Sequence, residues 1–171
     1  MHDFVAKALG TEEKAKQLWK QYYQRVDQLK AALGDRYQDK EISIFGFSSQ
    51  WGFWIMVKNS FCGSIVHDVG LKRPQAQNVE TESGYVNFTS AEQLDMIDGD
   101  IIFVLASSEE DKKAFEKSIT EPLSKKLKAV QQRRIFFIDD ALAWNGATFI
   151  ATDVVLDDLE KYLVNTPKGQ S

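Results

Sequence analysis

TSAEQLDMIDGDIIFVLASS, residues 89–108, predicts a helix, a tight turn and a buried strand in immediate succession. Thr89 and Glu92 have the spacing of a capping box, in which paired side chains bind the free amide groups at a helix start. An Asp-Gly pair at 98–99 marks the turn, and the continuous apolar run at 101–106 favours a strand covered on both faces. These features indicate a layered α/β domain, in which ligands bind beyond the carboxyl ends of the strands.

Outside this run, helix and strand patterns alternate along the chain. Residues 11–33 have an amphipathic pattern that Gly34 ends, and the polar run at 72–84 is a loop of a length that is often functional. In the last helix we expect Ile150 to face inward. We expect strands at 41–47, 53–57, 101–106 and 134–138, and further helices at 60–69, 89–97, 109–117, 122–130 and 150–163. The predicted fold is α/β, a three-layer lobe with a central mixed, mainly parallel sheet and helices on both faces, preceded by a long helix.

The composition is typical of a soluble globular protein. The chain has 171 residues, 43% of them hydrophobic and 27% charged, which suffices for one domain with a core. Its formal net charge is -4, so the chain has no excess of basic residues of the kind found in nucleic-acid-binding proteins. No apolar run approaches a membrane span, and the first residues lack the apolar segment of a signal peptide. The single cysteine, Cys62, excludes an internal disulfide, and we interpret it as a small buried apolar residue.

Motifs for catalysis or metal binding are absent from the sequence. It contains no P-loop, no G-x-G-x-x-G and no zinc-binding set of His and Cys residues. Asp139 and Asp140 follow a predicted strand, as in a magnesium site, but the other predicted strands end without acidic partners. We interpret this pair as loop polarity and helix capping. The sequence therefore predicts no enzyme, no cofactor and no protein metal site.

Aromatic and hydroxyl-bearing side chains gather in four loops that we expect at the strand ends and that we expect to converge on one rim of the sheet. Such groups are typical of a binding cleft, because they combine apolar walls with neutral hydrogen-bonding partners. The alternative is that the two tryptophans among them are core residues with one exposed edge. The candidate ligand-binding residues are Ser48, Gln50, Trp51, Tyr85, Ser107, Ser108, Trp144 and Asn145.

Several short runs of sequence, taken together with their order along the chain, resemble the sequence pattern of one family. Residues 89–94 with 98–104 are similar to its run S-x-E-x-L … D-A-D-x-I-F, and 122–130 followed by 134–138 are similar to P-L-W-x-x-L-x-A-V-x-x-G-R-V. Further matches are LGTEEKA at 9–15, NSF at 59–61, VGL at 69–71, Trp144, and VLDDL at 155–159. From Phe4 to about Val164, the chain resembles the C-terminal lobe, with the linking helix, of periplasmic substrate-binding proteins of the iron-siderophore and vitamin B12 class.

The resemblance implies two α/β lobes joined by a long helix, with the ligand between them. It divides this chain into an interlobe linking helix at 1–34, a C-terminal ligand-binding lobe at 35–165 and a disordered tail at 166–171. We expect the N-terminal lobe and an export signal to lie outside this sequence. The implied function is binding of a ferric siderophore and its delivery to an inner-membrane ABC permease, without catalysis. The implied location is the periplasm, or a membrane-anchored lipoprotein facing it, and iron would arrive inside its chelator.

Carried over position by position, the family's cleft aromatics correspond to Tyr85 and to the pair Trp144 and Asn145. Catecholate binders place arginines at 48–51, where this sequence has neither Arg nor Lys, so a hydroxamate or citrate chelate is favoured. The acidic residue that docks this lobe on the permease corresponds to Asp68, where the family prefers Glu. We also expect the isolated lobe to expose an apolar patch and to self-associate.

Two alternatives stay open at this point. A vitamin B12 or haem binder would have the same fold, and a corrinoid spectrum of the full-length protein would favour it. A cytoplasmic flavodoxin-like interaction domain is the alternative from another class. An upstream gene start that encodes a signal peptide and a second lobe would exclude that alternative.

Overall fold

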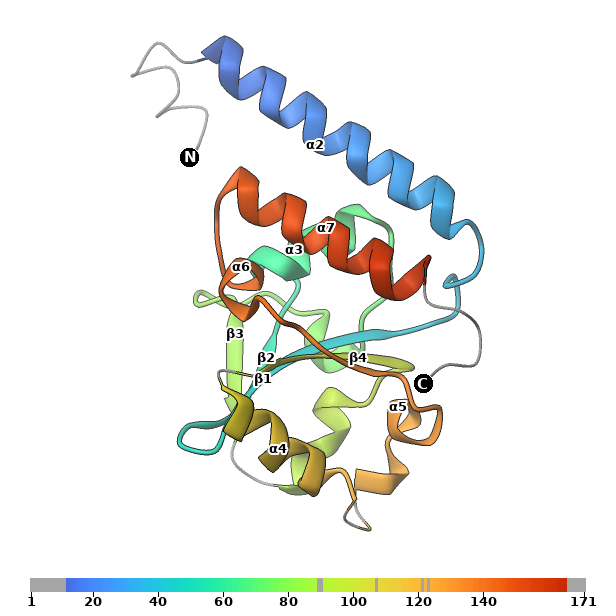
Figure 1. Cartoon of the computed structure of the whole chain (residues 1–171), viewed down its shortest axis with the longest axis vertical. Coiled ribbons are helices and arrows are strands. Elements are labelled where there is room, and N and C mark those ends of the chain that lie inside the picture. Colours follow the sequence, from blue (N-terminus) through green and yellow to red (C-terminus); the bar gives the residue numbers. More distant parts are fainter. Residues whose placement is uncertain (1–11, 89–90, 107, 121, 123, 166–171) are drawn as a thin grey trace.

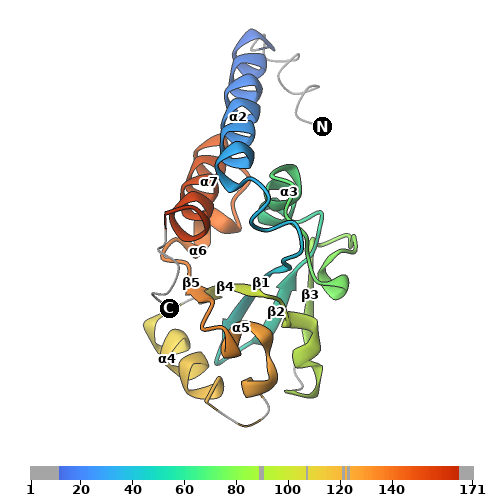
Figure 2. The same cartoon turned by 90° about the vertical axis from the view of Figure 1, so that its right-hand side faces the viewer.

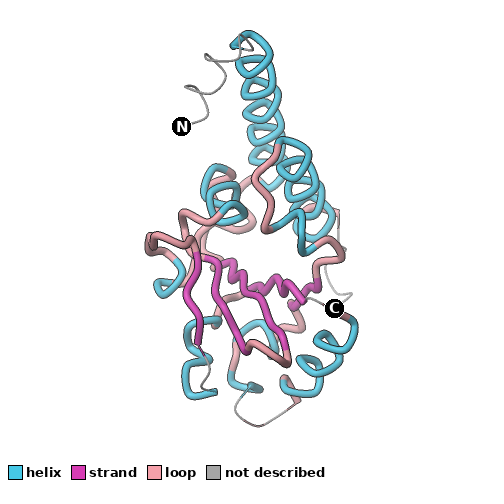
Figure 3. The backbone as a smooth tube through the Cα atoms, turned by 90° about the vertical axis from the view of Figure 1, so that its left-hand side faces the viewer, coloured by secondary structure: helices cyan, strands magenta, loops and turns pink. Residues whose placement is uncertain are grey.

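The computed structural model describes residues 12–88, 91–106, 108–120, 122 and 124–165 of the chain. The predicted capping residue Thr89, the predicted site residue Ser107 and the predicted tail lie outside the described residues. A central sheet separates two groups of helices (Figure 1, Figure 3), which confirms the predicted three-layer α/β architecture.

The sheet has five strands in the order β3-β2-β1-β4-β5. These are β1 (Ile42–Ser48), β2 (Gly52–Met56), β3 (Tyr85–Phe88), β4 (Ile101–Ala106) and β5 (Ile135–Phe137). β1 is parallel to β4, and β4 to β5, whereas β2 is antiparallel to both of its neighbours, β1 and β3. Of these strands, β2 alone is reversed, and Gly52 with a φ of 80° allows the tight turn that reverses it.

One face of the sheet is covered by four helices. They are α2 (Glu12–Leu33), α3 (Phe61–Asp68), α6 (Ala141–Trp144) and α7 (Phe149–Leu163). The N-terminal half of α2 projects beyond the other helices (Figure 2). Farther along α2, Arg25 donates hydrogen bonds to Asp153 Oδ1 at 2.7 Å and to Asp157 Oδ1 at 2.5 Å on α7. Beyond the end of α2, the Tyr37 hydroxyl donates to the Leu163 carbonyl at 2.8 Å, so the second half of α2 and the segment after it are both joined to α7.

The opposite face carries other helical elements. They are η2 (Ala91–Ile97), α4 (Glu109–Ser118), η3 (Ser124–Lys126) and α5 (Lys128–Gln131). Along β4, Ile101, Phe103 and Leu105 belong to the core under the first helix group, and Ile102 and Val104 belong to the core under the second. Each of these five side chains is at most 1% exposed. The prediction of a strand buried on both faces is confirmed.

Three predicted helices differ from the structure. Residues 91–97 form a 3₁₀-helix rather than an α-helix, and the helix predicted at 122–130 is divided into η3 and α5. The prediction that Ile150 faces inward is wrong, because its side chain is 79% exposed. Thr148 caps α7 by accepting from the Ala151 amide at 3.1 Å, and this helix start turns Ala151 inward and Ile150 outward.

The loop at 72–84, which its length and polarity suggested was functional, is tied into the core by two side chains. Gln77 is fully buried, and its Oε1 accepts hydrogen bonds from the Ile44 amide and from Arg73. Arg73 also donates to the Met56 carbonyl, but its Nε and one terminal nitrogen have no hydrogen-bond partner among the described residues. Burial lowers the pKa of Arg73 to about 10. This part of the loop therefore holds β1, β2 and the 3₁₀ segment η1 (Gln75–Gln77) together.

Candidate functional site

The carboxyl ends of β1, β4 and β5 lie at one edge of the sheet, because these neighbouring strands are parallel. Three segments follow from them: the hairpin turn at 48–52, the start of α4 at 108–112, and residues 138–140. We call these three segments the rim. In open α/β sheets this is the edge at which ligands bind.

Asp111 joins two segments of the rim. Its side chain is buried, and its Oδ1 accepts from the Ser49 amide at 2.7 Å and from the Ser49 hydroxyl at 2.8 Å. Its Oδ2 accepts from the Ser108 hydroxyl at 3.0 Å. The bonds from Ser49, and then the bond from Ser108, hold the pKa of Asp111 below its usual value, because they stabilise the charged carboxylate. This carboxylate therefore fixes the hairpin turn against α4.

Replacing Asp111 with Asn is expected to loosen the hairpin turn, because the new amide group has one acceptor oxygen instead of two. Hydrogen exchange of the Ser49 amide should accelerate about tenfold, as expected for losing a charge-assisted hydrogen bond. The folded pKa is depressed, so the stabilisation by Asp111 is present above the unfolded pKa and is lost as pH falls through the folded value. Denaturant unfolding curves of the two proteins, measured from neutral to acid pH, should therefore converge in acid.

The matched control for this change is Glu110→Gln, which removes an exposed carboxylate from the same helical turn. It should leave both the exchange rate and the unfolding curve unchanged. A difference between wild type and Asp111→Asn that persists undiminished in acid would contradict the role assigned to the charge.

A groove of about 180 Å³ opens on the rim. Its apolar wall consists of Ala106, Phe137 and Ile138, and its polar lining consists of Ser108, Glu109, Lys112 and Asp139. The ammonium group of Lys112 lies 5.2 Å from the centre of the Phe137 ring, within the range of a cation–π contact. An apolar wall with a few polar groups can position a small molecule.

A second groove, of about 200 Å³, lies among α2, α3 and the start of α7. Trp19, Phe61 and Phe149 line it, and the rings of Trp19 and Phe149 are in edge contact at 5.2 Å. Asp68 also lines it, and its Oδ2 accepts from the Tyr22 hydroxyl at 2.8 Å. Burial, and then the bond to Asp68, raise the pKa of Tyr22. The predicted docking residue Asp68 is thus a half-exposed carboxylate with a partner in α2.

Within the described part of the chain, no three His, Cys, Asp or Glu side chains are placed to hold a metal ion. No described helix is long and apolar enough to span a membrane.

The family of the protein follows from comparison with known sequences. Residues 3–142 match a family model described as periplasmic binding protein. The chain belongs to the periplasmic binding protein family. This assignment confirms the predicted class, a binding protein rather than an enzyme.

Two relatives of this binding protein are named for the binding of a siderophore or of ferric citrate. It is 30% identical over 169 residues to the probable siderophore-binding lipoprotein YfiY of Bacillus subtilis, covering 94% of this chain and 51% of the relative. It is 30% identical over 135 residues to the Fe(3+)-citrate-binding protein YfmC of the same organism, covering 79% of this chain and 40% of the relative. The chain thus spans about half the length of the curated relatives that it matches.

Solved structures agree with this assignment. Staphylococcus aureus SirA superposes with a TM-score of 0.83 at 26% identity, over 97% of this chain and 64% of SirA. Bacillus subtilis FeuA in complex with ferri-bacillibactin superposes with a TM-score of 0.74 at 25% identity, over 91% of this chain and 55% of FeuA. These likenesses confirm the predicted mixed α/β fold.

Five of the predicted site residues of this binding protein lie on or beside the rim. Ser48 is buried, and its hydroxyl accepts from the Gln50 amide at 3.2 Å within the hairpin turn. Gln50 and Trp51 are exposed at the hairpin tip, and 74% of the surface of Trp51 is accessible. Ser108 caps α4. Asn145 is exposed just after α6, and its side chain donates to the Ala141 carbonyl at 2.8 Å.

Two predicted site residues are placed differently. Tyr85 begins β3 and pairs with Met56, so it lies at the opposite end of that strand from the rim. The prediction that its loop shares an edge with the others is wrong, because β3 runs away from Tyr85 toward the rim. Trp144 is fully buried, with its ring 5.2 Å from Phe103 and its indole N–H donating to Asp158 at 2.9 Å. The alternative of a core tryptophan is the one that the structure supports for Trp144.

Other residues near the rim were not predicted. Leu142 and Ile150, in the first turns of α6 and α7, are 86% and 79% exposed. Lys112 and Asp111 resemble ordinary helix-surface charges in the sequence, and their positions depend on how α4 packs. For Ile150 a sign was available, since it does not fit the inward spacing set by Ala151 along the same helix, but only the exact helix start reveals it.

Proposed function

We propose that the chain is the C-terminal lobe and linking helix of the solute-binding component of an ABC importer, which binds a ferric siderophore. Residues 1–34 are the linking segment and 35–165 the ligand-binding lobe, with a second lobe outside this sequence. The observation that carries the proposal is the rim of a periplasmic-binding-protein fold, where an exposed aromatic side chain and a groove lie at the edge used by ligands. YfiY and YfmC, named for siderophore and ferric citrate binding, supply the ligand class.

Within that class we favour a hydroxamate or citrate chelate. The hairpin turn at 48–52 contains no Arg or Lys, and Lys112 is the one cation that lines the described part of the groove. A tris-catecholate chelate carries several negative charges and needs more cations than this rim offers. Iron belongs to the ligand, so no resident metal or cofactor is required.

Delivery to an inner-membrane permease completes the proposal, with the protein in the periplasm or anchored as a lipoprotein facing it. We assign Asp68 to the docking surface, because it is the carboxylate of α3 that remains partly accessible beside an apolar groove. The exposed side chains Leu142 and Ile150 favour self-association of the isolated lobe, which sedimentation at increasing concentration would detect.

The test is calorimetric titration of the full-length protein with ferric siderophores. Trp51→Ala should weaken binding about tenfold, because it removes the exposed aromatic surface at the rim. Tyr85→Ala is the matched control, since it removes a half-exposed aromatic side chain from the other end of β3 and should leave affinity unchanged.

Each other outcome has a definite meaning. Equal loss of affinity in both variants would contradict the location of the site but not the ligand class. Absence of binding to any ferric chelate, with saturable binding of cobalamin or haem, would replace the siderophore with one of those ligands.

A further inference from the structure

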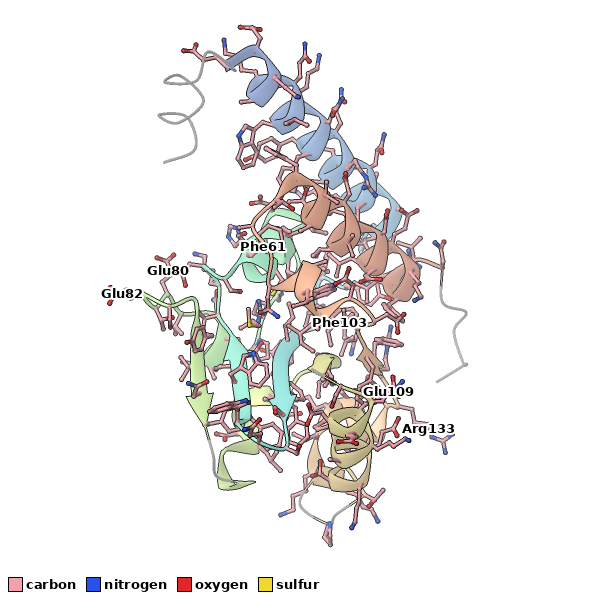
Figure 4. The ribbon with its side chains drawn as sticks, turned by 60° about the vertical axis from the view of Figure 1, so that its left-hand side comes forward. Phe61, Glu80, Glu82, Phe103, Glu109 and Arg133 are labelled. Carbon is pink, nitrogen blue, oxygen red and sulfur yellow. The ribbon has the colours of Figure 1, made fainter. Side chains whose placement is uncertain are left out.

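The groove on the rim is lined by more carboxylate groups than ammonium groups. Two carboxylates from different segments, Glu109 and Asp139, line it together with the single ammonium group of Lys112. Glu109 opens α4, as Figure 4 shows, and Asp139 is the second residue after the end of β5. The groove is therefore acidic on balance, although its wall is apolar.

Neighbouring charges do not reverse this balance. Glu110 and Asp140 stand next to the two lining carboxylates, and the hairpin turn on the other side of the rim has no charged residue. Lys161 lies 3.5 Å from Asp139 and offsets part of its charge. Across the described rim, carboxylates still outnumber ammonium groups.

Lys112 is further limited as an anion partner by its position. Its ammonium group lies over the Phe137 ring, inside the groove, where an entering ligand meets it together with Glu109 on the preceding turn of the same helix. An anionic ligand would gain one attraction and meet two repulsions. A cationic group would gain two attractions and meet one repulsion.

We propose that the rim selects ferric chelates of zero or positive net charge over anionic ones. This inference rests on the proposed function and narrows it, from a hydroxamate or citrate chelate to a trihydroxamate, above all one with a pendant ammonium group. Ferric citrate and catecholate chelates are anionic and would be disfavoured. Because Glu109 is exposed and the Asp139 side chain is 83% exposed, the selection should weaken as salt is added.

The experiment titrates the full-length protein with three ferric chelates that share one iron-binding shell. Ferrioxamine B carries a pendant ammonium group, its N-acetyl derivative is neutral, and its N-succinyl derivative carries a carboxylate instead. At low salt, the affinity ratio between the ammonium and carboxylate forms should be about tenfold, and near unity in strong salt. In the double variant Glu109→Gln, Asp139→Asn this ratio should fall at least about threefold.

The matched control is Glu80→Gln, Glu82→Gln, which removes two carboxylates from the loop on another side of the lobe (Figure 4). It should leave the ratio unchanged. If all three chelates bind and the rim variant leaves the ratio as it was, charge selection by the rim is wrong while siderophore binding stands. If none of the three chelates binds but an anionic ferric chelate does, charge selection by the rim is likewise wrong, while binding of a ferric chelate stands. If no ferric chelate binds at all, the proposed function fails, and the inference fails with it.

Discussion

Replacing Trp144 with Ala is expected to lower the free energy of unfolding by about 3–5 kcal/mol, the usual cost of removing a large buried aromatic side chain. Trp144 is 0% exposed and packs on Phe103 beneath α7. The change also leaves Asp158, which burial already disfavours as an ion, without its indole partner. Urea unfolding monitored by circular dichroism would measure the loss.

The variant Trp144→Phe separates the two contributions, because it retains most of the ring volume and removes the N–H donor. Burial raises the pKa of Asp158, and the bond from Trp144 opposes that rise. Without the bond the pKa should rise further, so the folded state gains protons relative to the unfolded state as pH falls. The destabilisation by Trp144→Phe should therefore shrink in acid.

Trp51→Ala is the control for both variants, since its side chain is 74% exposed and its removal should change stability by less than about 0.5 kcal/mol. Equal destabilisation by Trp51→Ala and Trp144→Ala would contradict the burial described here. A loss of ligand affinity in Trp144→Ala has to be interpreted together with this loss of stability.

Replacing Gly63 with Ala is expected to destabilise the fold by about 2–3 kcal/mol, although the same change in an ordinary helix interior stabilises by about 1 kcal/mol. A Cβ atom at Gly63 would lie 2.1 Å from the Val57 carbonyl oxygen and 2.6 Å from Ser60 Oγ. The Ser60 hydroxyl caps α3 by accepting from the Gly63 amide at 3.0 Å. The new methyl group would therefore displace both the backbone before α3 and its cap.

Ser64→Ala tests this explanation, because Ser64 is the next residue of the same helix and is exposed. Its hydroxyl donates to the Phe61 carbonyl, so its loss should cost little. Thermal unfolding of the two variants gives the comparison. A Gly63→Ala protein as stable as wild type would show that the turn before α3 can move freely.

The layers of the fold were predictable because they depend on local chemistry. The apolar run at 101–106 has no polar position on either side, and a strand with that composition must be covered on both faces. The position of Tyr85 could not be predicted in the same way. It depends on β3 pairing antiparallel with β2 after a long loop, and no residue near Tyr85 encodes that pairing.

The residues of the site also divide into those that local sequence predicts and those that only packing determines. Gln50 and Trp51 lie in a turn that the sequence marks clearly, and they are at the rim as expected. Trp144 is an aromatic residue of the kind that lines clefts. However, the carboxylate that accepts a hydrogen bond from its indole N–H lies fourteen residues later, in α7. Asp111 meets Ser49 across a separation of 62 residues. Contacts of this kind arise from packing and have no signal in a short sequence window.

The contacts between α2 and α7 have a mechanical consequence. Trp19 meets Phe149, Arg25 meets Asp153 and Asp157, and Tyr37, which lies beyond the end of α2, meets Leu163, so the contacts follow the same order along the chain and along α7. A pull or a twist applied at the N-terminal end of α2 is therefore shared by α7 as shear between the two helices, and it also reaches α3 through the bond from Tyr22 to Asp68. The projecting half of α2 acts as a stiff lever on this lobe, so small rotations of the lobe become large displacements at the lever's tip.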